Sequence, residues 1–259
     1  MSNPSDIEVD ARGNGLVALT VNRQQKHNAL ARPVLAALAD AVHEAAGDAS
    51  ARCILLRGAG DKYFAAGGDL VDLASVRSDA EIDAMGDQAR TALDAIRNCP
   101  VPVVAYVNGD ALGGGAELAV ACDMRLIAPH ARIGFIQGRM GITSAWGGGP
   151  DLIALIGPAR AMRMMARCEM IDAARAVAWG LADLEVRDGL DGDDMKNFIE
   201  PMLERSALVA RGIKAQTIAW RNGLMLVPRR DIERTHLRAT WASAEHWAAV
   251  DRFLSRDKS

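Results

Sequence analysis

The first half of the chain alternates between short apolar runs and longer amphipathic segments. Residues 15–22 alternate in polarity and are rich in β-branched side chains, while residues 51–60 and 101–109 are apolar runs that end near glycine. Each of these patterns predicts a strand. Residues 32–48 and 78–100 instead carry apolar side chains at helical spacing. Shorter elements follow, a helix at 116–123 and strands at 123–129 and 131–136. This alternation predicts an α/β core with mostly parallel neighbouring strands.

Several helix ends are marked by the local sequence. Ser78 and Glu81 have the spacing of a capping box, and Pro100 follows the end of the same helix. Gly47 lies where the preceding helix would have its C-cap, and Asp172 and Gly180 bracket a later helix. These signals place the helix boundaries independently of the apolar pattern.

Beyond about residue 150 the pattern predicts helices and no further strand, with helices at 157–170, 172–180, 193–220 and 229–256. No repeat, low-complexity tract or long linker separates the two halves. We therefore expect an αβ core over residues 1–190 and a helical region over 191–259. Helices with exposed apolar stripes at a chain end often form subunit contacts, so this region predicts an oligomer.

Composition excludes several classes of function. The chain has 259 residues, a net charge of -3 and no basic cluster, which argues against a nucleic-acid partner. No apolar run is long enough to span a membrane, and the polar start is unlike a signal peptide. The four cysteines lack metal-ligand spacing, so we expect buried reduced thiols and no metal site. Together these features predict a cytoplasmic protein.

Two glycine-rich turns, at residues 62–70 and 111–118, each connect a strand region to a helix. Glycine allows close approach to a ligand, and a helix start offers free N–H donors. Two such turns facing one point would form an oxyanion hole, although both could also be plain connections. Asp69 could then be an ordinary N-cap and Glu117 a partner of the helix dipole. Neither turn has a dinucleotide or P-loop fingerprint.

Four blocks in unbroken order resemble the enoyl-CoA hydratase/isomerase, or crotonase, superfamily. They are LTVNRQQKHNAL (19–30), ILLRGAGDKYFAAGGDL (54–70), VPVVAYVNGDALGGGAELAVACDMRLIA (101–128) and MGITSAWGGGPDLIALIG (140–157). The resemblance implies a ClpP-like spiral of ββα units and a C-terminal helical trimerisation region. It also implies a homotrimer or dimer of trimers, and acyl-CoA substrates with no cofactor beyond their own coenzyme A.

Individual residues take their expected roles from this resemblance. The N–H groups of Gly68 and Gly114 match those that hold the thioester oxygen. The segments that bind the adenine and pantetheine of coenzyme A match two stretches here, and the candidate substrate-binding residues in them are Lys26, His27, Ala29, Ala66, Gly67, Asp69 and Leu70. Lys26 and His27 could equally be solvated surface residues.

Two positions depart from the hydratase pattern of the family. Glu117 matches the first of the two catalytic glutamates, but the second falls on Gln137, which cannot exchange a proton near neutral pH. Trp146 stands where hydratases carry small residues; it would either narrow an acyl pocket or belong to the core. Arg139 could pair with a substrate carboxylate or lie on the surface.

With a further tryptophan at Trp241, this combination looks most like the ethylmalonyl-CoA/methylmalonyl-CoA decarboxylase branch. Loss of carbon dioxide leaves an enolate directly, so no base is needed. Glu117 would then return a proton, and Gln137 would bind the leaving carboxylate. We expect decarboxylation of a short malonyl-CoA-type thioester. The alternatives are a 2-enoyl-CoA hydratase or isomerase, and an inactive scaffold or binding subunit.

Overall fold

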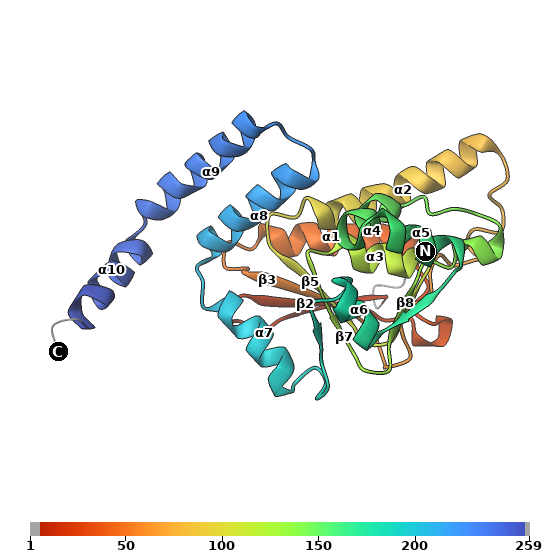
Figure 1. Cartoon of the computed structure of the whole chain (residues 1–259), viewed down its shortest axis with the longest axis horizontal. Coiled ribbons are helices and arrows are strands. Elements are labelled where there is room, and N and C mark those ends of the chain that lie inside the picture. The colour runs from red at the N-terminus through yellow and green to blue at the C-terminus, as the bar shows by residue number, and fades with distance from the viewer. Residues whose placement is uncertain (1–5, 257–259) are drawn as a thin grey trace.

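A six-stranded sheet forms the centre of the protein (Figure 1). The structure is a computed structural model and describes residues 6–256. In sheet order the strands are β1 (Ile7–Ala11), β2 (Leu16–Val21), β3 (Cys53–Gly58), β5 (Val103–Val107), β7 (Met124–Ile127) and β10 (Leu184–Glu185). Only β1 pairs antiparallel; the other neighbours run parallel.

The inner strands confirm the reading of the apolar runs. Every residue of β2 and of β5 is buried, as expected of parallel strands covered on both faces. The predicted strands at 15–22, 51–60, 101–109 and 123–129 correspond to β2, β3, β5 and β7. β1 was not predicted, although its sequence alternates in polarity; it is an edge strand, and four of its five residues are exposed.

A second sheet of four short strands carries the turns predicted to bind substrate. Its order is β4 (Tyr63–Ala65), β6 (Asp110–Leu112), β8 (Arg132–Gly134) and β9 (Met170–Asp172). The expectation that no strand follows residue 150 is wrong, because β9 pairs with β8 and β10 pairs with β7. Strands of two or three residues show no periodicity, and their partners are distant in sequence. Met170, assigned to a helix at 157–170, belongs to β9.

The helices up to residue 179 lie around the two sheets and against one another (Figure 1). They are α1 (Arg32–Gly47), α2 (Asp79–Arg97), α3 (Gly114–Ala121), α4 (Gly148–Ile156), α5 (Pro158–Ala166) and α6 (Ala173–Trp179), with single 3₁₀ turns η1 (Gln24–Lys26) and η2 (Gln137–Met140). All eight residues of α3 are buried. α4 was not predicted, because the glycines at its start are typical of a turn rather than of a helix.

The predicted helix ends largely agree with the structure. Ser78 and Glu81 form the capping box at the start of α2, and their hydrogen bonds lower the pKa of Glu81 to about 2. Asp172 caps α6, which ends at Gly180 in the left-handed region. Gly47 is the last residue of α1 rather than its C-cap, a position that Asp48 takes.

The C-terminal region has four helices where two long ones were expected. They are α7 (Asp193–Leu203), α8 (Ala207–Arg221), α9 (Leu226–Trp241) and α10 (Ala244–Arg256). Ser206 caps α8 through the N–H of Val209 at 3.3 Å and so separates it from α7. Helices α9 and α10 extend away from the sheets (Figure 1) and expose large apolar side chains, among them Trp241, Trp247 and Phe253.

None of the helices described between residues 6 and 256 is both long and apolar enough to cross a membrane. The ends of the two predicted regions, at residues 1–5 and 257–259, lie outside the described residues.

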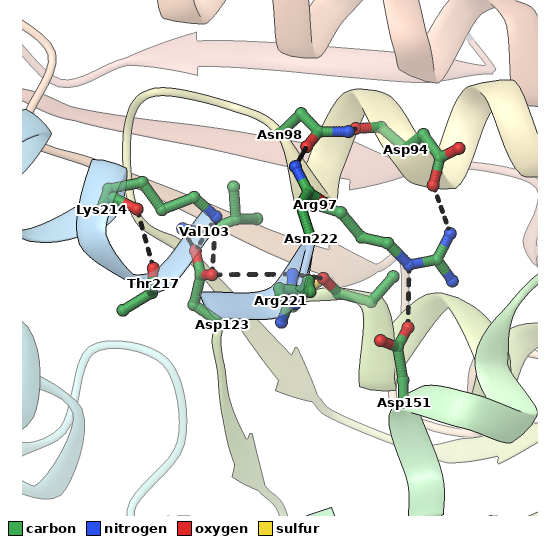
Figure 2. Close-up of polar contacts among 12 residues, drawn as sticks. Asp94, Arg97, Asn98, Val103, Asp123, Asp151, Lys214, Thr217, Arg221 and Asn222 are labelled. Atoms are coloured by element: carbon green, nitrogen blue, oxygen red, sulfur yellow. Dashed lines mark hydrogen bonds and ion pairs between the residues drawn. The ribbon is translucent and has the colours of Figure 1, made fainter. Parts of the chain in front are cut away.

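A buried ion pair joins the C-terminal helices to the core (Figure 2). Lys214 of α8 contacts both carboxylate oxygens of Asp123 at 2.6 Å, and its side chain is only 2% exposed. Asp123 follows α3 and also accepts a hydrogen bond from the N–H of Val103, at the start of β5, at 2.8 Å. One carboxylate thus connects α3, β5 and α8.

Replacement of Lys214 by alanine should lower the free energy of unfolding by about 3 kcal/mol, because it leaves the largely buried Asp123 carboxylate with only the more distant Arg221, at 3.9 Å, as a charged partner. Urea denaturation at a fixed protein concentration measures this loss. The matched control is Arg234→Ala, which breaks the exposed ion pair with Asp231 and should cost less than about 1 kcal/mol. Equal losses in the two variants would contradict this assignment.

Candidate active site

A single cavity of about 620 Å³ brings together all the residues predicted to act on or bind substrate. It lies among the loop after β4, the start of α3, η2 and the loop before α4. The predicted residues that line it are Lys26, His27, Ala29, Ala66, Gly67, Gly68, Asp69, Leu70, Gly114, Glu117, Gln137 and Trp146. Arg139 lines it as well, on an exposed side chain whose Nη2 donates to the carbonyl oxygen of Cys168 at 2.9 Å.

The two glycine turns offer free backbone donors at this cavity. Gly114 is the first residue of α3, where a helix leaves its N–H groups without intrahelical partners. Within residues 6–256, the N–H groups of Gly68 and Gly114 donate to no protein acceptor. The turns lie side by side, since a Cβ atom on Gly67 would be 3.5 Å from the Gly114 nitrogen. The cavity wall therefore has the donors that an oxyanion hole needs.

Glu117, in the first turn of α3, is buried, and both of its carboxyl oxygens accept hydrogen bonds. Its Oε2 accepts from the backbone N–H groups of Trp146 and Gly148, both at 2.9 Å. Its Oε1 accepts from Nε2 of Gln137 at 2.9 Å. A Cβ atom on Gly148 would lie 2.5 Å from Cγ of Glu117, so only glycine lets the backbone approach this closely. The carboxyl group has a fixed orientation as a result.

Opposing effects set the proton affinity of Glu117. Burial raises its pKa above the ordinary value, and this effect is the largest. Hydrogen bonds from Gly148, Trp146 and Gln137 act in the opposite direction and offset part of the shift. The Gly148 donor belongs to the start of α4, whose dipole also favours the carboxylate. The net result is a carboxyl group that holds its proton to higher pH than an exposed glutamate.

Gln137 occupies the position next to Glu117 that the sequence predicted for it. The acidic residues that line the cavity are Asp69 and Glu117. Asp69 is already engaged, because its carboxylate pairs with Nη2 of Arg23 at 3.0 Å and accepts from the N–H of Val71. Burial acts to raise the pKa of Asp69, yet these hydrogen bonds hold it below the usual range. Glu117 thus has an amide rather than a second carboxylate as its partner.

Trp146 packs in the hydrophobic core and also lines the cavity. The two predicted positions for this residue, in the core and beside the acyl pocket, are therefore compatible. A Cβ atom on Gly114 would lie 2.3 Å from a carbon of the indole ring, and one on Gly68 would lie 3.5 Å from it. The indole therefore packs against both glycines and reduces the space beside their N–H groups.

The residues expected near coenzyme A lie at the mouth of the cavity. Lys26 and His27 are exposed, which also agrees with their reading as solvated residues. The His27 ring packs against Tyr63, with ring centroids 4.6 Å apart. Leu70 is exposed on the opposite turn.

Sequence reasoning missed the loop that binds Glu117. Its donors are backbone N–H groups at Trp146 and Gly148, which any residue type could supply. One signal was present: the glycine triplet at 147–149 precedes an apolar helix, as the triplet at 113–115 does. Behind the loop, Arg97 and Asp151 hold it through side-chain contacts that no local pattern predicts.

Between residues 6 and 256, no group of three or more His, Cys, Asp or Glu side chains could hold a metal ion. All four cysteines are free, but only Cys53, Cys99 and Cys122 are buried as expected; Cys168 is half-buried. Burial raises the pKa of Cys53 and Cys122 to about 12.

Comparison with known proteins places this site in a family. Residues 11–259 match the family described as enoyl-CoA hydratase/isomerase. The chain is 33% identical to mitochondrial methylglutaconyl-CoA hydratase of Mus musculus over 185 residues, which cover 71% of this chain and 59% of that protein. It is 29% identical to ethylmalonyl-CoA decarboxylase of Rattus norvegicus over 247 residues, which cover 94% and 82%.

A solved enoyl-CoA hydratase from Bacillus anthracis superposes with a TM-score of 0.89 at 27% identity, covering 97% of each chain. This likeness confirms the predicted crotonase fold, with its mixed sheets and surrounding helices. The chain belongs to the enoyl-CoA hydratase/isomerase family.

Proposed function

We propose that this protein decarboxylates a short malonyl-CoA-type thioester through an enolate. The observation that carries the proposal is the pairing of the buried Glu117 with the amide of Gln137, beside the free N–H groups of Gly68 and Gly114. A site of this kind can stabilise an enolate and move one proton, but the partner beside Glu117 is an amide and not a second carboxylate.

The first step needs charge stabilisation rather than a base. When the bond between the α-carbon and the carboxylate breaks, carbon dioxide leaves. The electron pair of that bond stays with the thioester, which becomes an enolate. Negative charge then develops on the thioester oxygen, where the N–H groups of Gly68 and Gly114 would bind it. Loss of one such donor costs about 2.7–4 kcal/mol of transition-state stabilisation.

The second step needs one proton, which Glu117 can supply. Its Oε2 is occupied by two N–H donors, whereas Oε1 accepts only from Gln137, so the proton belongs on Oε1. Transfer to the α-carbon gives the saturated acyl-CoA and leaves a carboxylate, which regains a proton from water. Rotation of the Gln137 amide would present its oxygen to the protonated form and its N–H to the ionised form.

The walls of the cavity suggest the size and orientation of the substrate. Trp146 narrows the space beside the two glycines, which favours a short acyl group. Lys26 and His27 at the mouth are placed for the coenzyme A portion, and we propose no cofactor beyond it. The match to the rat decarboxylase, which spans 94% of the chain, supports this substrate class.

Hydration of a 2-enoyl-CoA is the second candidate, and the likeness to the mouse hydratase favours it. Ionised Glu117 would then activate water, with Gln137 as a hydrogen-bonding group. An inactive scaffold is a third possibility, but the intact donors and the buried carboxyl group argue against it.

We also propose a homotrimer or dimer of trimers, supported by the exposed apolar side chains of α9 and α10. The cytoplasmic location stays a prediction, since the mouse relative is mitochondrial.

Incubation with methylmalonyl-CoA, ethylmalonyl-CoA and crotonyl-CoA, followed by mass spectrometry, tests the proposed reaction. We expect the two malonyl-type thioesters to lose the mass of carbon dioxide. Turnover of crotonyl-CoA alone would reject decarboxylation. If calorimetry detects no binding of any of the three esters, the scaffold alternative is favoured instead.

Glu117→Gln should reduce kcat about 10²- to 10⁴-fold, the usual contribution of a general acid, and should leave binding of the thioester nearly unchanged. The pH profile of the wild type gives a second readout. As a proton donor, Glu117 must be protonated, so kcat should fall as pH rises through its raised pKa. A loss of activity as pH falls would show that the ionised form is active, as hydration requires.

Gln137→Glu should introduce crotonyl-CoA hydration, because it places a second carboxyl group beside Glu117. The isosteric control is Gln137→Met, which keeps the volume but can neither titrate nor position water. Hydration of crotonyl-CoA by both variants would show that a second carboxyl group is not required for hydration at this site. Product masses distinguish these outcomes.

A further inference from the structure

Helix α2 holds the loop that in turn holds Glu117. In the last turn of α2, Arg97 donates from Nη2 to the carbonyl oxygen of Trp146 at 3.0 Å. The N–H of the same Trp146 donates to Oε2 of Glu117 at 2.9 Å. Trp146 is thus fixed on one side by Arg97 and fixes Glu117 on the other.

Arg97 also orients the second donor to Glu117. Its Nε contacts Oδ2 of Asp151 at 2.8 Å, in the first turn of α4, whose first residue is Gly148 (Figure 2). Between the two donors lies Gly147, in the left-handed region at φ 87°. A Cβ atom there would lie 2.9 Å from Nη2 of Arg97, so the guanidinium packs directly against the turn.

The environment of Arg97 suits a fixed rather than a mobile contact. Its side chain is 9% exposed, and Asp151 and the half-exposed Asp94 flank it (Figure 2). Burial acts to lower the pKa of Arg97, but these two carboxylates hold it above the ordinary value. Arg90, two turns earlier on α2, donates to the carbonyl oxygen of Ala145 at 2.9 Å from an exposed position, where water competes.

We propose that Arg97, together with Asp151, is a positioning pair that holds the Trp146 and Gly148 N–H groups on Glu117. The consequence for catalysis rests on the proposed function, in which Glu117 carries the proton. Without Arg97 the two donors would separate from Oε2, and the carboxyl group would lose both its orientation and the hydrogen bonds that favour its ionised form.

The charged groups around Glu117 define the controls. Asp69, Lys26 and Arg139 line the cavity. Arg90, Asp94, Arg97 and Asp151 lie behind the loop, on α2 and α4. Removal of a positive charge would by itself raise the pKa of Glu117, so Arg97→Lys, which keeps the charge but not the planar fork, separates charge from position. Loss of the Asp151 charge alone would lower that pKa, so an upward shift in Asp151→Asn can only report lost positioning.

The test follows the titration of the Glu117 carboxyl carbon by ¹³C NMR in glutamate-labelled protein, with the signal assigned by Glu117→Gln. We expect the Glu117 pKa to rise in Arg97→Ala and Arg97→Lys, and to rise less in Asp151→Asn. We expect kcat on the accepted thioester to fall about tenfold to a hundredfold in the Arg97 variants, with KM little changed, because a small displacement of a catalytic group is enough for such a loss. Arg90→Ala should change both readouts less than Arg97→Ala does, because the contact between Arg90 and Ala145 is exposed to water.

An unchanged titration and kcat in folded Arg97→Ala would overturn the proposal, as would full restoration of both by Arg97→Lys. If Arg97→Ala does not fold, Asp151→Asn decides: an unchanged or lowered pKa of Glu117 rejects the positioning pair. If wild-type protein turns over no acyl-CoA, the proposed function fails, while the NMR arm still decides whether Arg97 positions Glu117.

Discussion

The structure depends most on one constraint: a carboxyl group buried at the start of a fully apolar helix must be hydrogen-bonded. Ionisation of a carboxyl group buried there without hydrogen-bond donors would cost several kcal/mol. Such a group would therefore remain protonated. Glu117 meets this constraint with two backbone N–H groups and one amide. Those donors come from the loop before α4 and from η2, so the surrounding elements are arranged around this group.

The same helix is held near both ends by a hydrogen-bonded carboxyl group. At its start, Glu117 binds the loop that leads into α4; just after its end, Asp123 binds Lys214 of α8 (Figure 2). Between them every residue of α3 is buried and no polar side chain intervenes. Apolar packing alone has little directional preference, so these two hydrogen-bonded carboxyl groups determine how far α3 can slide or rotate. A fixed α3 in turn fixes Gly114 at the cavity.

The parts of the fold that the sequence predicted are those with local signals. Residues 32–48 and 78–100 form the predicted helices and bury most of their regularly spaced apolar side chains; Ile82 is exposed, and Met85 lines the cavity. The short strands β4, β6, β9 and β10 could not be predicted, because pairing with distant strands creates them. The site residues were found through the family resemblance, which groups residues by motif. The role of Arg97 lay beyond it, since an arginine in the last turn of a helix is also an ordinary partner of the helix dipole.

The amide partner changes what Glu117 can do with its proton. Two carboxyl groups at this distance would titrate as a coupled pair and share protons between them. With Gln137 in the second place, Glu117 titrates as one group, whose pKa burial raises and hydrogen bonding restrains. A reaction that consumes one proton at one carbon requires that both states be accessible: the acid before transfer and the carboxylate after it. The three hydrogen-bond donors stabilise the ionised form of Glu117, and burial stabilises its protonated form. A single carboxyl group that can adopt both forms suits protonation of an enolate better than an addition of water that needs two carboxylates.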